Sequence, residues 1–78
     1  MLACPCCQHL TLSQRGTYDI CPVCYWQDDP IDEWAPDDPS WANGGITAAQ
    51  GRENFLAIGA CRQEHVPHVR AANPDEIP

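Results

Sequence analysis

The sequence contains no lysine, and large apolar side chains are few, with one phenylalanine, two tyrosines and three tryptophans among 78 residues. Strictly apolar runs fall far short of the roughly 20 residues that a membrane-spanning helix requires. A chain of this length buries only about 60% of the surface that it exposes when unfolded, so we expect one small domain. Because such a core stabilises a fold by only a few kcal/mol, an additional constraint is needed, and the six cysteines are the obvious source.

The charge balance is strongly acidic, since eleven acids and four arginines give a formal net charge of −7. Nucleic-acid binding depends largely on cationic side chains that contact phosphates, and the four arginines do not cluster in the sequence. We therefore expect no nucleic-acid partner and no membrane partner. A protein with a basic surface is the expected partner, although acidic runs are also common in solvated loops. The densest acidic run consists of Asp28, Asp29, Asp32, Glu33, Asp37 and Asp38.

The first residues lack the features of a secretory signal. Met1–Cys4 carries no basic start, and no apolar stretch of signal-peptide length follows it. We therefore expect a cytoplasmic protein. In a reducing compartment, closely spaced cysteines serve more often as metal ligands or redox groups than as structural disulfides.

Composition divides the expected single domain (residues 1–78) into four segments. A cysteine-rich hairpin occupies residues 1–26, an acidic tryptophan-bearing loop residues 27–45, a helix residues 46–61 and a polar tail residues 62–78. This order predicts a small metal-stapled α+β fold, with a zinc-ribbon-like knuckle hairpin, an acidic loop and one C-terminal helix.

Two short strands are predicted between the cysteine pairs. His9–Leu12 and Thr17–Ile20 have strand-like composition, and the turn-like segment Ser13–Gly16 separates them. Antiparallel pairing of these strands would place Cys7 close to Cys21. The expected hairpin therefore brings the two cysteine pairs together.

A helix is predicted to start at Thr47, whose hydroxyl can accept from the Gln50 amide while the Gln50 side chain reaches back to the Thr47 amide. The helical pattern continues to about residue 60, and Gly59 is a suitable end. The face expected to be buried consists of Ala49, Leu56 and Ala60, with Phe55 and Ile58 at its edges.

Two C-x2-C motifs, Cys4–Cys7 and Cys21–Cys24, are separated by thirteen residues. Zinc binds four thiolates tetrahedrally at about 2.3 Å, and a two-residue spacer lets one tight turn direct two sulfurs to a single point. Proline follows the first cysteine of each motif, which favours the outer cysteines as ligands: Cys4, Cys7, Cys21 and Cys24. Such a shell has no open coordination position, so we expect structural zinc and no enzyme activity. Iron is the less favoured metal, since four thiolates also hold iron in electron carriers.

The remaining cysteines and the histidines have simpler interpretations. Cys6 is expected to be an extra thiol exposed at the knuckle, with a spare ligand or reactive thiol as the alternative. Cys61 is expected to be a small buried apolar residue. His9 is at best a reserve ligand, and His65 and His68 fit a solvated tail.

Four aromatic residues, Tyr25, Trp26, Trp34 and Trp41, interleave with the acids. The tryptophans either cover the knuckles and the helix, or Trp34 or Trp41 projects from the loop as an anchor for a basic partner. The candidate partner-binding residues are Asp28, Asp29, Asp32, Glu33, Trp34 and Trp41.

Many segments along the chain match one recognisable pattern. They include Cys4-Pro5-Cys6-Cys7, Leu10-Thr11-Leu12, Gly16-Thr17-Tyr18, Ile20-Cys21-Pro22-Val23-Cys24, Trp26-Gln27-Asp28-Asp29, Asn43-Gly44-Gly45-Ile46-Thr47, Arg52-Glu53-Asn54-Phe55 and Gly59-Ala60-Cys61. In these segments the chain resembles the bacterial cysteine-rich CPCC family. The resemblance implies a small zinc-binding domain, and it supplies neither catalytic residues nor an established partner. Gln8 stands where such turns often carry glycine.

Three functions are compatible with these features. The leading one is a non-enzymatic zinc-binding protein that acts as a protein-interaction module through its acidic, aromatic surface. The second is an immunity or inhibitor protein whose acids imitate nucleic-acid phosphates and block a basic toxin or nuclease. The third is an iron or thiol redox carrier.

Overall fold

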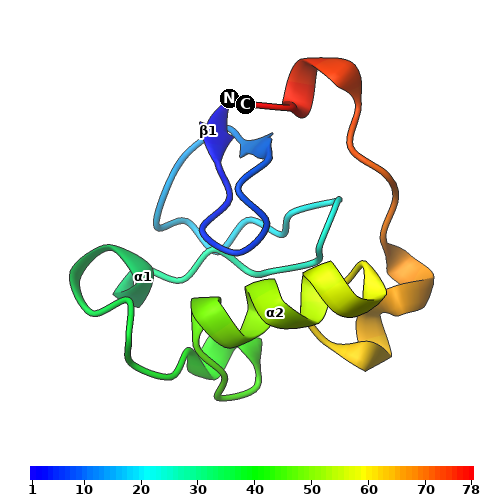
Figure 1. Cartoon of the computed structure of the whole chain (residues 1–78). Coiled ribbons are helices and arrows are strands. Elements are labelled where there is room, and N and C mark those ends of the chain that lie inside the picture. Colours follow the sequence, from blue (N-terminus) through cyan, green and yellow to red (C-terminus); the bar gives the residue numbers. More distant parts are fainter.

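A computed structural model describes residues 1–78 (Figure 1). Strands β1 (Leu2–Ala3) and β2 (Leu10–Leu12) pair antiparallel. The α-helices are α1 (Ile31–Trp34) and α2 (Ala48–Ile58), and the 3-10 helices are η1 (Trp41–Asn43), η2 (Gln63–His68) and η3 (Pro74–Glu76). The tail runs from the end of α2 back to the strands, so the two chain ends lie together in Figure 1.

The first cysteine pair lies in the tight turn that joins β1 to β2. The amide of Gln8 donates to the carbonyl of Cys4 at 2.8 Å, and the amide of Cys4 donates to the carbonyl of His9 at 2.9 Å. These two bonds close the turn and direct the side chains of Cys4 and Cys7 to the same side.

The second cysteine pair repeats this arrangement. The amide of Tyr25 donates to the carbonyl of Cys21 at 2.8 Å, and the amide of Cys21 donates to the carbonyl of Trp26 at 2.9 Å. An isolated antiparallel bridge between Ile20 and Gln27 flanks the turn, in the place that the paired strands take in the first turn. The two turns are therefore structurally equivalent.

The residue after each pair has a left-handed backbone. Gln8 and Tyr25 both have a φ of 69°. Residues with a Cβ pay of the order of 1–2 kcal/mol for this conformation, which glycine adopts freely. Gln8 thus adopts the left-handed conformation that glycine usually adopts in such turns. The turn is the same, but it is less stable by this conformational free energy.

The predicted pairing of His9–Leu12 with Thr17–Ile20 is wrong, because β2 pairs with β1. The chain after Tyr18 instead folds back on the segment that follows the second turn: the amide of Tyr18 donates to the carbonyl of Asp28 at 2.9 Å, and the amide of Asp28 donates to the carbonyl of Asp19 at 2.8 Å. Each cysteine turn is closed by the chain on its own two sides, so pairing occurs around each turn rather than between the turns.

Helix α2 begins and ends with the predicted caps. The hydroxyl of Thr47 accepts from the amide of Gln50 at 3.1 Å, and the side-chain oxygen of Gln50 accepts from the amide of Thr47 at 2.9 Å. Gly59 ends the helix with a φ of 81°. The helix is therefore shorter than the predicted segment 46–61.

The buried face of α2 is not the predicted one, since only Ala60 of the three expected residues is buried and it lies beyond the end of the helix. Ala48 and Gly51 are buried and Phe55 packs against the core, whereas Leu56 is 78% exposed. A Cβ at position 51 would lie 2.9 Å from the ring of Trp26. The absence of a side chain at Gly51 lets the helix lie directly on this ring, and that contact determines which face is buried.

The core consists largely of cysteine. Its buried members are Cys4, Cys6, Leu12, Cys21, Val23, Cys24, Trp26, Ala48 and Cys61. The chain therefore buries few large apolar side chains, which agrees with the expected need for a further constraint.

The segment 27–45 is an ordered loop, as predicted, and it contains only the short helices α1 and η1. Asn43 fastens it to the second cysteine turn: its side chain donates to the carbonyl of Gln27 and accepts from the amide of Gln27, both at 2.7 Å.

The tail lies along the domain. The amide of Arg70 donates to the carbonyl of Pro22 at 3.2 Å, and the Arg70 guanidinium forms two bonds with the Glu76 carboxylate, at 2.8 and 2.9 Å. No helix in the chain combines the length and the apolar character that crossing a bilayer demands.

Candidate metal centre

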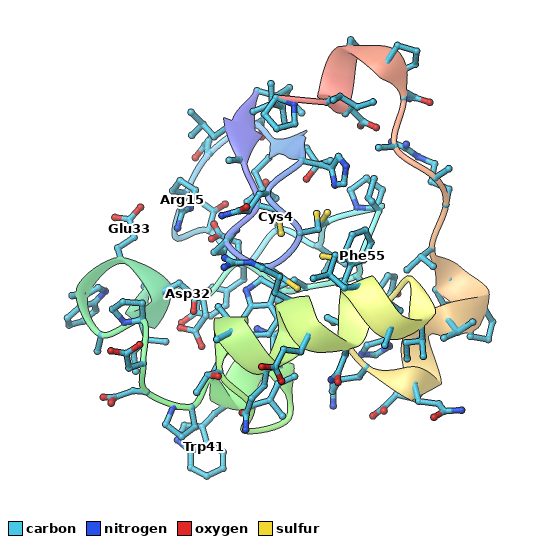
Figure 2. All side chains as sticks on the ribbon, viewed as in Figure 1. Cys4, Arg15, Asp32, Glu33, Trp41 and Phe55 are labelled. Atoms are coloured by element: carbon cyan, nitrogen blue, oxygen red, sulfur yellow. The ribbon has the colours of Figure 1, made fainter.

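The four predicted ligand residues lie together, two from each cysteine turn. Figure 2 shows one of them, Cys4, above α2. The four sulfurs are all within 4.8 Å of one another, with 3.6 Å between the sulfurs of Cys4 and Cys24 and 3.8 Å between those of Cys7 and Cys21. A tetrahedron with metal–sulfur bonds of about 2.3 Å has edges of about 3.8 Å. The cluster therefore has the dimensions of a four-thiolate metal site, and all six cysteines are free rather than bridged.

Two groups donate hydrogen bonds to the cluster. The hydroxyl of Thr11, which is buried in β2, lies 3.0 Å from the sulfur of Cys21, and the amide of Trp26 donates to the sulfur of Cys24 at 3.4 Å. Donors of this kind stabilise thiolates and orient them for a metal.

The four sulfurs shift one another's pKa values through their mutual hydrogen bonds. Hydrogen bonds from Cys24, Cys4 and Cys7 lower the pKa of Cys21, while the bonds with Cys21 raise the pKa of the other three. A metal binds cysteine as thiolate, so a divalent cation that binds here releases protons from the cluster. Soft sulfur donors suit zinc or iron and do not suit calcium or magnesium.

The comparison with known families agrees with this geometry. The family described as "Cysteine-rich CPCC" matches residues 2–76. The chain belongs to this family. No curated protein matches the chain. Membership in the cysteine-rich CPCC family and the four-sulfur cluster together fit a small metal-binding protein.

Cys6, the extra cysteine of the CPCC motif, was expected to be exposed, and this expectation is wrong. It is fully buried, and its sulfur lies 3.1 Å from the point where a Cβ on Gly51 would stand. Cys6 therefore packs beneath α2, outside the group of four sulfurs. Cys61 is buried as predicted, and burial raises the pKa of its thiol to about 12, so this thiol stays protonated.

The histidines of this CPCC protein lie outside the four-sulfur cluster. His9 packs edge-on against Phe55, with ring centroids 5.8 Å apart. The expectation of a solvated tail is right for His68, which is exposed, and wrong for His65, which is half-buried. The ring of His65 lies 4.7 Å and that of His68 5.3 Å from the ring of Tyr25.

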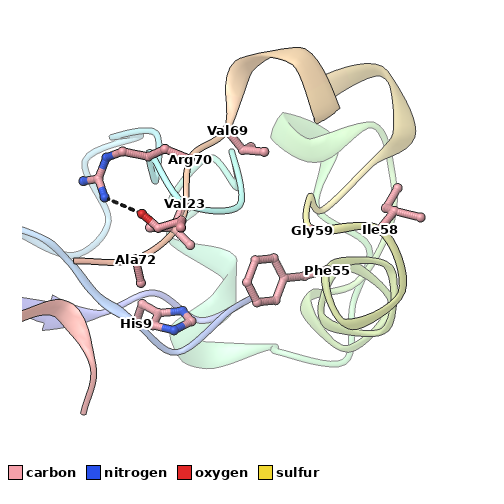
Figure 3. Close-up of a pocket in the computed structure, with 9 residues that line it drawn as sticks. His9, Val23, Phe55, Ile58, Gly59, Val69, Arg70 and Ala72 are labelled. Carbon is pink, nitrogen blue, oxygen red and sulfur yellow. Dashed lines mark hydrogen bonds between the residues drawn. The ribbon is translucent and has the colours of Figure 1, made fainter. Parts of the chain in front are cut away.

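One cavity of about 330 Å³ lies between the end of α2, the tail and the first cysteine turn (Figure 3). Its titratable lining side chains are His9 and Arg70, and Arg70 is ion-paired with Glu76. The cavity therefore offers no nucleophile beside a general base. The lining residues are His9, Val23, Phe55, Ile58, Gly59, Val69, Arg70, Ala71 and Ala72.

Asp28 was expected on an exposed acidic surface. This expectation is wrong, because Asp28 is fully buried. Its carboxylate accepts hydrogen bonds from the amides of Gly16 and Thr17 and from the Arg15 guanidinium at 3.4 Å. These donors compensate for the cost of burying the charge, and Asp28 serves to fix the turn before Tyr18.

Two further acids of the predicted partner surface also have internal bonds. Asp32 is 8% exposed and accepts from the indole nitrogen of Trp26 at 2.9 Å. Burial raises the pKa of Asp32. Asp29 is half-buried and accepts from the amide of Ile31 at 3.1 Å and from the hydroxyl of Ser40 at 2.7 Å. Their carboxylates hold α1 and the loop in place instead of facing a partner.

The other members of the predicted partner surface are exposed. Trp34 is 77% exposed and Trp41 is 84% exposed, and Trp41 points away from the body of the molecule in Figure 2. Glu33 is exposed too, although its carboxylate lies 3.8 Å from Nε of Arg15. Asp37 and Asp38 are exposed between the two tryptophans. We call residues 33–41 the anchor loop.

Two supporting residues were not predicted from the sequence. Thr11 lies between two leucines in Leu10-Thr11-Leu12, where a polar side chain in an apolar strand could have indicated an internal partner. Arg52 donates to the carbonyls of Cys6 and Pro5, both at 2.9 Å, and so joins α2 to the first cysteine turn. Its position four residues after Ala48 places it beside the buried face.

All four cationic side chains of the chain have partners within it. Arg15 pairs with Asp28, Arg52 bonds the carbonyls of the first turn, Arg62 pairs with Glu64, and Arg70 pairs with Glu76. The charge that remains available on the surface of this CPCC protein is therefore predominantly negative.

Proposed function

We propose that this protein is a non-enzymatic, zinc-binding interaction module whose anchor loop binds a basic protein surface. The proposal rests on one observation: every guanidinium is engaged within the chain, while Trp34, Trp41 and the acids Asp37 and Asp38 are exposed on one loop. Exposed aromatic residues beside carboxylates are suited to a partner that carries arginine or lysine, because the aromatic rings supply binding energy and the charges guide association.

Zinc is the proposed metal, held by Cys4, Cys7, Cys21 and Cys24, and its role is structural. Four thiolates complete the tetrahedral shell, so no position is left for a substrate or an activated water. When bound, zinc supplies a rigid link between the two cysteine turns. Six free cysteines fit a reducing cytoplasm, where we place the protein.

Two alternatives have less support. An immunity or inhibitor protein that imitates phosphates would depend on Glu33, Asp37 and Asp38, since Asp28 and Asp32 are buried. A thiol redox carrier would need a reactive thiol, and Cys6 and Cys61 are both fully buried. An iron carrier would be coloured, and metal analysis separates it from a zinc protein.

Affinity capture from cytoplasmic extract with the zinc-loaded chain tests the interaction. We expect a basic protein whose capture weakens as salt concentration rises, because exposed charge pairs are screened. The triple variant Glu33→Gln, Asp37→Asn, Asp38→Asn should lose this protein, and Trp34→Ala with Trp41→Ala should lose it as well.

The matched control changes three exposed acids outside the anchor loop: Asp19→Asn, Glu53→Gln and Asp75→Asn. It alters the net charge by the same amount and should retain the partner. Equal loss in both triple variants would show that only total charge matters, and absence of any salt-sensitive partner would exclude the interaction role.

A further inference from the structure

A strap formed by residues 62–72 is fastened to the second cysteine turn. The ring of Tyr25, next to Cys24, packs against His65 with centroids 4.7 Å apart and against His68 with centroids 5.3 Å apart and planes within 30° of parallel. The backbone bond from Arg70 to Pro22 fastens the strap further along. The contact with Tyr25 is therefore one of two attachments.

A single hydrogen bond fixes the protonation state of His65. Nη2 of Arg62 lies 2.8 Å from Nε2 of His65. A guanidinium has donors only, so Nε2 of His65 must be an unprotonated acceptor and the ring must be neutral. The strap is thus assembled around a neutral histidine.

The Arg62 side chain is only 25% exposed beside this histidine. Its Nη1 pairs with Glu64 at 3.1 Å, and its Nε is buried without a partner. A positive charge that appears on His65 would face Arg62 at hydrogen-bond distance and repel it.

We propose that the strap is a pH-responsive latch: protonation of His65 removes the acceptor for Arg62, places two cations against each other and releases residues 62–72 from Tyr25. The groups that face His65 are Arg62, Glu64, His68 and Tyr25. Of the two histidines on Tyr25, only His65 is bonded to Arg62. His65 is therefore the residue that opens the latch.

The electrostatics around His65 set the direction of the pH dependence. Burial, Arg62 and His68 lower the pKa of His65, and Glu64, which pairs with Arg62 at 3.1 Å, opposes them. Because the pKa is lower in the closed strap than in a released one, closure is fully favoured above the ordinary histidine pKa of about 6.5 and weakens as pH falls below it.

Opening would change the cavity as well as the tyrosine contact. Val69, Arg70, Ala71 and Ala72 form one of its walls, and Figure 3 shows Val69 and Ala72 on the side opposite Phe55. Release of the strap therefore uncovers Val23, the core residue between the second pair of cysteines.

NMR titration of the zinc-loaded chain from about pH 8 to about pH 5, which spans the ordinary histidine pKa, tests the latch. We expect His65 to titrate with a midpoint below that of an unperturbed histidine, and the Tyr25 ring signals and the Arg70 amide to shift with the same midpoint. Native mass measurement at each pH reports whether zinc stays bound. Constant Tyr25 and Arg70 signals while His65 titrates would overturn the proposal.

Variants separate the latch from a general effect of acid. In His65→Gln the amide oxygen can accept from Arg62 without titrating, so the coupled shift should disappear, whereas His68→Gln should keep it. Glu64→Gln removes the exposed carboxylate that pairs with Arg62, and it should lower the His65 midpoint. A His65→Gln chain that retains the wild-type transition, or an unchanged midpoint in Glu64→Gln, would contradict the latch.

Discussion

Thr11 shows how one side chain supports the sulfur cluster. Its hydroxyl is the only side-chain group other than sulfur that bonds the cluster, at 3.0 Å from the Cys21 sulfur. Thr11 lies in β2 between Leu10 and Leu12, the two residues that pair with β1. A neutral hydroxyl that donates to a thiolate lowers the cost of negative charge in a buried site. Thr11 therefore belongs to the metal centre although it binds no metal itself.

Thr11→Val should weaken zinc binding by about tenfold, because a methyl group of similar shape replaces the donor while the packing stays. Competition with a chelator of known zinc affinity measures the change. Thr17→Val is the control, since the Thr17 side chain is exposed. Equal zinc affinity in the two variants would show that the Thr11 hydroxyl does not stabilise the cluster.

The sequence identified the cysteines better than it identified the acids. Spacing in two short motifs is enough to place four sulfurs in two turns, so Cys4, Cys7, Cys21 and Cys24 were found from local pattern alone. Whether an aspartate is buried depends on donors elsewhere in the chain: Asp28 meets the Gly16 amide, whereas Glu33 remains exposed. Such partners are not visible from the acidic run itself.

The start of helix α2 could be predicted from neighbouring residues, but its buried face could not. Its capping box involves only Thr47 and Gln50, so its start was predictable. Its buried face is set by Trp26, a residue from a distant part of the chain, and the pattern of apolar residues gave the wrong face. The strand pairing failed for the same reason, because β1 has only two residues and gives little signal.

Gly51→Ala tests the contact that positions α2. Helix propensity alone would stabilise this variant by about 1 kcal/mol. The added Cβ would lie 2.9 Å from the Trp26 ring, and such overpacking costs roughly 1–3 kcal/mol. We therefore expect a net loss of stability in chemical denaturation of the zinc-loaded chain.

The control for this prediction is Ala57→Gly on the exposed side of α2. It should lose about 1 kcal/mol through propensity alone. A Gly51→Ala chain that is more stable than the wild type would mean that α2 does not rest on Trp26.

At the scale of the whole molecule, the chain combines a small apolar interior with a predominantly negative surface. Five of the nine core residues are cysteines, and three of these belong to the sulfur cluster. In small zinc-binding peptides the metal contributes about 10–16 kcal/mol, as much as the entire stability of an ordinary domain. The metal is therefore expected to hold together the two turns on which α2 and the tail pack.

The most direct test is a zinc titration of the reduced, metal-free chain, followed by the dispersion of its amide NMR signals and by native mass measurement. We predict that the metal-free chain is unfolded and that the folded spectrum appears in proportion to zinc, reaching completion at one ion per chain. A metal-free chain that already gives the folded spectrum, with the same thermal stability as the zinc-loaded chain, would contradict this view of the fold.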